Sequence, residues 1–461
     1  MKNLHSDIIC ALATPNGIGA IGVVRVSGQN CLDMISPIFG KDLKQKASHT
    51  LHFGTIKTKD GSLIDEVLIS VFQDGKSFTG EESAEISCHG SSYILQQVIS
   101  VLLEQGCRMA EPGEFTMRAF MNGKLDLSQA EAVADLIASE SKKAHEIALN
   151  QLRGNFSSEL NGLREQLIHF ASLVELELDF SEEDVEFADR TELLALVTHV
   201  LQVVTRLEQS FELGNAIKNG VPVAIVGAPN TGKSTLLNQL LQEDRAIVSN
   251  IAGTTRDVIE ETLNIDGILF RLIDTAGIRD NAEEIEALGI ERSKQKIEQA
   301  KLVLCMADAS IASSLDEVRL WKNELLSAYP NKRIVLIVNK SDVAEVTLLD
   351  NEIAISAKEG KNIESLKTWM VNQITQGADM QNETIISNVR HRDALTRTRE
   401  ALQQAKTGLE TNITGDFVAM DIRQAMYHLG TITGNISKMI CWRIYLASFV
   451  SESNLCKINN H

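Results

Sequence analysis

The chain has 461 residues, of which 44% are hydrophobic and 23% charged, a composition typical of a globular protein with roughly three domains. Its formal net charge of −18 argues against passive binding of nucleic acid, which needs a basic footprint. No uncharged apolar run of about 18 residues and no secretory signal pattern occur, so we expect neither a membrane span nor export. The scattered cysteines, without a CxxC pair, favour the reduced thiols of a cytoplasmic protein.

Residues 1–122 mix short β-like runs with turns, which predicts an α+β domain. The predicted strands are AIGVVRVSG, EVLISVFQ and SAEISCHG, and one helical stretch is predicted near 91–105. GIGAIG fits a dinucleotide fingerprint, but the strand-like VVRVSG follows it where that fingerprint needs a helix, so we interpret it as a glycine-rich loop. Cys88 and His89 would point to opposite faces of a strand, which argues against a catalytic pair.

The residue pattern changes twice more along the chain. Residues 123–216 and 379–437 carry apolar side chains at helical spacing, which predicts amphipathic helices. Residues 217–378 contain short apolar runs separated by helical segments, which is typical of a parallel sheet flanked by helices. These runs are VPVAIVGAP, GILFRLIDTAG, KLVLCMADAS and RIVLIVNKSD. The simplest interpretation is an α/β domain inserted into a helical domain.

The segment GAPNTGKS, residues 227–234, fits the phosphate-binding pattern G-x-x-x-x-G-K-[ST]. It follows a β-like run and precedes the helical STLLNQLL, which is the context that a P-loop requires. Backbone N–H groups of such a loop, together with the helix N-terminus, attract phosphate oxygens. Lys233 would reach the β- and γ-phosphates, and Ser234 would bind Mg²⁺.

Three further motifs indicate GTP. DTAG (274–277) ends a predicted strand and places Asp274 near the metal. NKSD (339–342) ends another strand, and its Asp342 can accept two hydrogen bonds from guanine that adenine does not offer. SAK (356–358) would close over the base. Four nucleotide motifs in this order predict GTP rather than ATP.

The group that would activate water is not the usual one. Ras-like enzymes place a Gln directly after DTAG, whereas this chain has Ile278, which cannot form a hydrogen bond. A carboxylate in the acidic segment NAEEIEALG, residues 281–289, is a candidate instead. In the predicted switch SNIAGTTRD, residues 249–257, Thr255 is able to bind Mg²⁺.

Asn230 lies directly before TGKS and has two interpretations. It could be a neutral oxygen ligand of a monovalent cation, together with Ser249 and the backbone around Ile251. It could equally be an amide that caps the loop.

The motifs and their flanking segments closely resemble the tRNA modification GTPases of the MnmE (TrmE) family. The resemblance extends from about Ile8 to Ile436. Outside the nucleotide motifs it is carried by ATPNGIGAIGVVRVSG, SFTGEESAEISCHG, PGEFTMRAFMNGKLDLSQAEAVADLI and IAGTTRDV. A GTPase domain alone would not contain the first three, so the resemblance is specific to this family.

The resemblance implies a multidomain fold that combines α/β and α+β parts. Residues 1–122 would form an α+β domain that binds folate and dimerises. Residues 123–216 and 379–437 would form an all-helical domain split in sequence. Residues 217–378 would be an inserted Ras-like P-loop GTPase (G) domain with a doubly wound sheet.

The resemblance also implies the roles of individual residues. Glu286 would be the catalytic carboxylate, within the acidic segment noted above. Mg²⁺ would be held by Ser234 and Thr255, and K⁺ by Asn230, Ser249, Ile251 and Thr254. The folate site would use Arg25, Glu85 and Lys124. The nucleotide site would comprise Asn230, Thr231, Gly232, Lys233, Ser234, Thr235, Ser249, Asn250, Ile251, Ala252, Gly253, Thr254, Thr255, Asp274, Thr275, Ala276, Gly277, Asn339, Lys340, Ser341, Asp342, Ser356, Ala357 and Lys358.

For function, the resemblance implies a potassium-stimulated GTPase that hydrolyses GTP to GDP and phosphate. Its homodimer would form a heterotetramer with a flavoprotein of the MnmG (GidA) family. Together they would add a carboxymethylaminomethyl-type group to carbon 5 of the wobble uridine of certain tRNAs, using a 5-formyl or 5,10-methylene tetrahydrofolate. The alternative is a GTPase switch in ribosome or RNA maturation without modification chemistry, which would not need a folate site.

Residues 438–461 depart from the family pattern, which ends in a Cys-Ile-Gly-Lys-type sequence. The codons permitted for residues 438–454, read from the third base of Lys438, can spell Asp-Asp-Leu-Leu-Ala and later Phe-Cys-Ile-Gly-Lys, followed by a stop. We therefore expect this tail to be out-of-frame translation. It would leave GTP binding intact and abolish the modification step, and no site is assigned to it.

Overall fold

The computed structural model describes residues 7–179, 190–244, 261–273, 295–344, 346–375, 384–411 and 413–435. The chain divides into two compact units. Unit 1 comprises residues 1–133 with 433–461, and unit 2 comprises residues 134–432. Among the helices in the described ranges, none combines the length and the apolarity that crossing a membrane requires.

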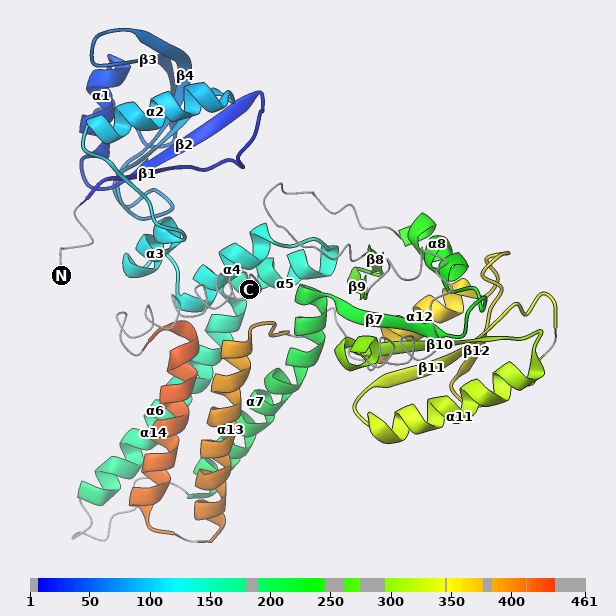
Figure 1. Cartoon of the computed structure of the whole chain (residues 1–461). Coiled ribbons are helices and arrows are strands. Elements are labelled where there is room, and N and C mark those ends of the chain that lie inside the picture. The colour runs from blue at the N-terminus through cyan, green and yellow to red at the C-terminus, as the bar shows by residue number, and fades with distance from the viewer. Residues whose placement is uncertain are drawn as a thin grey trace. The chain divides into compact units, whose positions relative to one another are not determined.

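Unit 1 is built on one six-stranded sheet with helices packed against it (Figure 1). In spatial order its strands are β3 (Thr50–Lys57), β4 (Leu63–Phe72), β5 (Ser83–His89), β2 (Ile21–Ser27), β1 (Ile9–Leu12) and β6 (Arg108–Met109). Its helices are α1 (Cys31–Phe39), α2 (Ser92–Glu104) and α3 (Glu114–Met121). Alternate strand residues such as Val26, Ile69 and Ile86 share a buried core with Leu32 of α1 and Leu102 of α2, which confirms the predicted α+β class.

The prediction of one helical stretch in this unit was incomplete, because α1 and α3 form as well as α2. Pro37 lies within α1 and Gly40 ends it in a left-handed conformation, so the sequence there looks like a turn. Strand β3 was also missed. Its Gly54 looks like a strand breaker, yet a Cβ at that position would lie 2.4 Å from the Phe39 ring. The glycine therefore makes room for α1.

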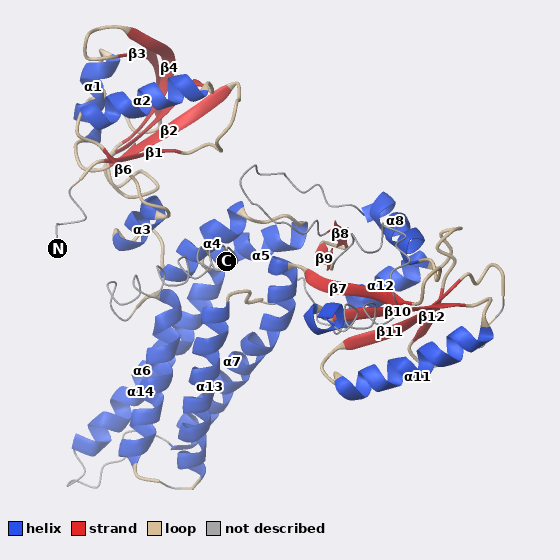
Figure 2. Ribbon diagram, in the orientation of Figure 1, coloured by secondary structure: helices blue, strands red, loops and turns tan. Residues whose placement is uncertain are grey.

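The helical part of the chain forms the predicted amphipathic helices (Figure 2). They are α4 (Leu127–Ile137), α5 (Lys142–Leu152), α6 (Asn155–Asp179), α7 (Arg190–Asn219), α13 (Val389–Glu410) and α14 (Gly415–Thr433). In unit 2, α6, α7, α13 and α14 enclose one apolar core, with Leu160, Val200, Leu402 and Ile422 fully or almost fully buried. Segments on both sides of the nucleotide motifs thus contribute to one helical core.

The second sheet lies in unit 2, and six of its strands fall within the described residues. In spatial order they are β12 (Glu352–Ala354), β11 (Arg333–Asn339), β10 (Leu302–Asp308), β7 (Val221–Gly227), β9 (Ile268–Leu272) and β8 (Glu261–Ile265). The flanking helices are α8 (Lys233–Asp244), α11 (Ala312–Ala328) and α12 (Ile363–Thr375). The sequence had indicated a parallel sheet, but the sheet is mixed. Strand β8 pairs antiparallel with β9 through a turn at Asp266–Gly267.

Helix α7 belongs to both cores of unit 2. Its first part buries Val200 and Leu207 in the helical bundle, while Ala216 and Ile217 at its end are buried in the core of the sheet. Gly220 follows in a left-handed conformation, and β7 begins at the next residue. One continuous helix therefore leads from the bundle core into the strand that carries the P-loop.

Candidate functional site

The P-loop joins β7 to α8, as the motif predicted. Asn230 and Gly232 have positive φ angles of 60° and 94°. A Cβ at Gly232 would lie 2.2 Å from Nδ2 of Asn339, so only glycine fits there. The loop is thus shaped by its glycine and by a residue more than a hundred positions later in the chain.

Lys233 begins α8 and folds back over the P-loop. Its Nζ donates hydrogen bonds to the carbonyl oxygens of Gly227 at 2.8 Å and Ala228 at 2.7 Å. Burial lowers the pKa of Lys233, and the nearby positive charge of Lys296 lowers it further. An ammonium group held in this way would be stabilised by an anion at the mouth of the loop, which is what a nucleotide phosphate supplies.

Asn339 connects the P-loop to the SAK motif. Its buried side chain donates from Nδ2 to the carbonyl oxygen of Thr231 at 2.8 Å and accepts at Oδ1 from the N–H of Ala357 at 2.9 Å. The first contact reaches the phosphate loop and the second the predicted base loop. Three of the sequence motifs therefore meet at one amide group.

Asp342 and Ser356, both predicted from the sequence to bind the guanine base, contact each other. The Ser356 hydroxyl hydrogen-bonds the Asp342 carboxylate and lowers its pKa, so this exposed acid stays ionised and ready to accept hydrogen bonds. Ser341 is fixed by its N–H, which donates to the Ile355 carbonyl oxygen at 3.1 Å. The NKSD and SAK motifs are therefore adjacent in the structure as well as in the prediction.

Asp308, at the carboxyl end of β10, was not predicted from the sequence. It pairs with Lys340, and its Oδ1 accepts from the Ser310 hydroxyl at 2.6 Å. Burial alone would raise the pKa of Asp308, but these hydrogen bonds outweigh it and the pKa lies below its ordinary value. The available signal was its place at the end of a parallel strand, the edge where α/β sheets bind ligands.

Several predicted site residues lie outside the described residues. They are Ser249, Asn250, Ile251, Ala252, Gly253, Thr254, Thr255, Asp274, Thr275, Ala276, Gly277 and Glu286. Tail residues 438–461 lie outside them too. Thr235 and Lys358 are described, in α8 and just after Ala357.

In unit 1, Arg25 and Glu85 face each other across β2 and β5. Arg25 donates to Glu85 Oε1 from Nε at 3.0 Å and from an Nη at 2.7 Å, and both side chains are about 30% exposed. The guanidinium carbon lies 5.6 Å from the ring centroid of Phe78 and 5.7 Å from that of Phe115, within the range of a cation–π contact. Two aromatic rings therefore lie against a partly exposed ion pair.

Lys124 contacts the loop that carries Phe78, one of the two rings beside Arg25. Its Nζ donates to the Gly75 carbonyl oxygen at 2.6 Å, and a Cβ at Gly80 would lie 3.2 Å from its Cγ. The three predicted folate residues thus come from two strands and from the turn after α3, and the loop 75–82 contacts that turn. Phe78 and Phe115 were not predicted individually, although both lie within motifs that carried the family resemblance.

Arg118, in α3, is completely buried beneath this region. Its Nη2 contacts Asp7 at 2.7 Å and Glu114 at 3.1 Å, and its Nη1 lies 3.2 Å from Glu81. A fully desolvated guanidinium needs such partners, so the three carboxylates and Arg118 form one charged network. Cys88, by contrast, is buried and His89 is exposed, which confirms that the two do not form a pair.

Known proteins and protein families match almost the whole length of the chain. The family described as GTP-binding protein TrmE N-terminus matches residues 8–124, and the MnmE helical domain matches residues 127–439. A tRNA modification GTPase MnmE from Flavobacterium psychrophilum is 50% identical over 446 residues, covering 94% of this chain and 96% of that one. Another from Cytophaga hutchinsonii is 51% identical over 441 residues, covering 94% and 95%.

Among solved structures, an Aquifex aeolicus Era variant bound to GDP and AlF4⁻ is 27% identical. It covers 40% of this chain and 67% of that one, with a TM-score of 0.25.

Proposed function

Because the chain belongs to the MnmE (TrmE) family of tRNA modification GTPases and is itself a GTP hydrolase, we propose that it couples GTP hydrolysis to modification of the wobble uridine of tRNA. The tRNA part of this proposal is supported by the relatives, which are tRNA modification GTPases. The GTP part is supported by the junction at Asn339, where the phosphate loop and the predicted guanine-binding loop are held by the same side chain. Such a junction fixes the distance between the two ends of a bound nucleotide.

The proposed nucleotide is GTP. Asp342 would accept from the guanine base, Lys233 would bind its phosphates, and Ser234 with Thr255 would hold Mg²⁺. Asn230, Ser249, Ile251 and Thr254 would hold the K⁺ that stimulates hydrolysis, and Glu286 would be the catalytic carboxylate.

The proposed folate site is the Arg25–Glu85 pair together with Lys124. A pterin ring presents an amide-like edge with both donors and an acceptor, so a carboxylate beside a guanidinium fits it. The pair is partly exposed and therefore accessible to a ligand. A 5-formyl or 5,10-methylene tetrahydrofolate would supply the one-carbon unit for the modification.

The proposed assembly is a homodimer formed through unit 1, which then binds a flavoprotein of the MnmG (GidA) family in the cytoplasm. Leu51 and Phe53 of β3 and Leu68 of β4 are exposed on the sheet, and Phe53 and Leu68 are register partners. An apolar patch on a sheet face favours contact with a second copy. The joint product would be a carboxymethylaminomethyl-type group on carbon 5 of the uridine.

Folate binding separates this proposal from its alternative, a GTPase switch in ribosome or RNA maturation. We expect the chain to bind 5-formyltetrahydrofolate in isothermal titration calorimetry and Arg25→Met to abolish the heat, while both proteins bind GDP equally. Lys57→Met removes an exposed positive charge from β3 and should leave folate binding unchanged. A chain that binds GDP but gives no folate heat would favour the switch.

A further inference from the structure

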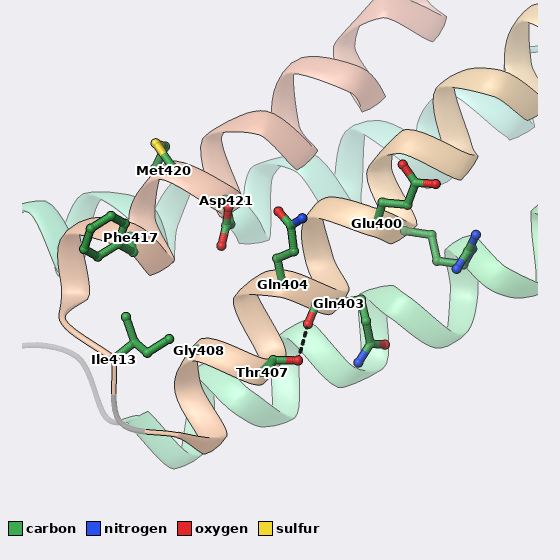
Figure 3. A pocket seen from close by; sticks show the side chains of 10 residues that line it. Glu400, Gln403, Gln404, Thr407, Gly408, Ile413, Phe417, Met420 and Asp421 are labelled. Carbon is green, nitrogen blue, oxygen red and sulfur yellow. Dashed lines mark hydrogen bonds between the residues drawn. The ribbon is translucent and has the colours of Figure 1, made fainter.

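Helices α13 and α14 of unit 2 leave a groove between them (Figure 3). Its volume is about 680 Å³. A Cβ at Gly408 would lie 3.3 Å from Val418, so the two helices approach each other closely at this end. Ile413, Phe417 and Met420 line one side, and Gln404 and Thr407 of α13 lie opposite. We call this hollow the α13–α14 groove.

The apolar side chains of the groove are unusually exposed for a helical bundle. Phe417 is 59% exposed, and Met420 and Ile413 are also exposed. Tyr427 continues the row along α14 at helical spacing and is 49% exposed. The opposite face of the same helix is buried, with Ile422 and its neighbours in the bundle core, so α14 has a second apolar stripe that its own bundle does not use.

The groove is also lined by two carboxylates, Asp421 and Glu400. Asp421 and Glu400 form no ion pair with any residue that the structure describes, whereas Arg399 is engaged with Glu208 at 2.7 Å. Burial raises the pKa of Asp421, which means that its carboxylate is partly removed from water without a partner. A cation placed there would relieve this cost.

The exposed apolar stripe and the two carboxylates favour one of three possible occupants: RNA, a second copy of the chain or a helix of another protein. RNA would bring phosphates against unpaired carboxylates, and a second copy placed groove to groove would bring like charges together. A protein helix with an apolar face and a basic side chain matches both the exposed stripe and the charge.

We propose that the α13–α14 groove receives an amphipathic helix of the partner flavoprotein, with its apolar face on Phe417 and Met420 and a Lys or Arg beside Asp421. This inference rests on the partnership proposed above. It specifies where on this chain the flavoprotein docks and which side-chain chemistry recognises it. Aromatic and Met side chains in a groove are the kind that dominate helix recognition, so Phe417 should contribute most of the affinity.

The test uses the full chain and the purified flavoprotein of the same genome, with affinity measured by biolayer interferometry. We expect Phe417→Ala to weaken binding roughly 10-fold or more. Asp421→Lys should weaken binding of the flavoprotein further, and most strongly at low salt. The introduced lysine would then repel the basic side chain of the docked helix. Leu320→Ala is the matched control, since Leu320 is an exposed leucine on α11, and it should bind as the unaltered chain does.

The outcomes are distinct. Loss of binding in both groove variants, with thermal melting and partner-free GTP hydrolysis unchanged, supports the proposal. Normal binding by either variant would show that the groove is not the docking site, while the proposed partnership with the flavoprotein would remain supported. Failure of the unaltered chain to bind the flavoprotein overturns both. Light scattering on the variants without the flavoprotein tests whether a second copy of the chain occupies the groove. A loss of self-association in these variants would assign the groove to a second copy and overturn the proposal.

Discussion

Asn339 links two loops of the proposed nucleotide site, because its amide holds Thr231 and Ala357 at the same time. In Asn339→Ala, two buried backbone groups lose their partners, which costs about 1–3 kcal/mol for each group. We expect a lower melting temperature of the nucleotide-free chain and weaker GDP binding by fluorescence titration. Asn331→Ala, at an exposed position before β11, is the control and should change neither quantity.

Asp342 should determine which base is bound. Asp342→Asn replaces an acceptor with a group that can donate to a xanthine carbonyl, so GTP affinity should fall at least about 10-fold while xanthosine triphosphate gains. Competition against a fluorescent guanine nucleotide measures both. Unchanged GTP affinity in this variant would mean that the base lies elsewhere.

At the scale of elements, α3 is attached to the sheet of unit 1 by charge. Burial would raise the pKa values of Asp7 and Glu114, but hydrogen bonds from Arg108 and Arg118 bring both below their ordinary values of 3.8 and 4.5. Acids with a depressed folded-state pKa stabilise the fold above their unfolded-state pKa and lose that contribution as the pH falls through the folded value. Unit 1 should therefore weaken below about pH 4.5.

This expectation can be measured through the buried cysteines of unit 1, Cys10, Cys31, Cys88 and Cys107. Their modification by dithiodipyridine in urea, followed by mass spectrometry, should begin at a lower urea concentration at pH 3.5 than at pH 6. In Arg118→Met the pH difference should shrink, and the stability at pH 6 should fall by about 3–5 kcal/mol because the acids lose their partner. An equal urea midpoint at both pH values would contradict the role of the network.

The elements that the sequence predicted well are those whose apolar pattern is continuous. Strands β7, β10 and β11 are buried on both faces and appear as unbroken apolar runs, so their positions and the P-loop after β7 followed directly. β8 was missed although the Asp266–Gly267 dipeptide between apolar runs is a hairpin signal. The Asn339 junction and the stacking of Phe78 and Phe115 on Arg25 depend on contacts far apart in sequence, which no local pattern encodes.

At the scale of the whole molecule, α7 should make the bundle and the nucleotide-binding sheet of unit 2 respond as one body. GDP at 100 times its Kd stabilises the state that binds it by roughly 2.7 kcal/mol. Because α7 is buried in both cores, hydrogen exchange should slow in bundle peptides from α7 and α13 as well as in β7 and α8. Slowing restricted to the sheet would show that the two parts open independently.

We propose that this GTP hydrolase serves tRNA modification in the cell. A Flavobacterium johnsoniae strain that lacks its own MnmE, a relative 50% identical to this chain, provides the test. Two versions would be expressed there, the chain as written and one whose residues 438–461 are replaced by the shifted-frame ending. Nucleoside mass spectrometry of bulk tRNA should show the modified wobble uridine restored by the second version alone, with GTP hydrolysis equal in both. A wobble uridine that stays unmodified with both versions would contradict the claim.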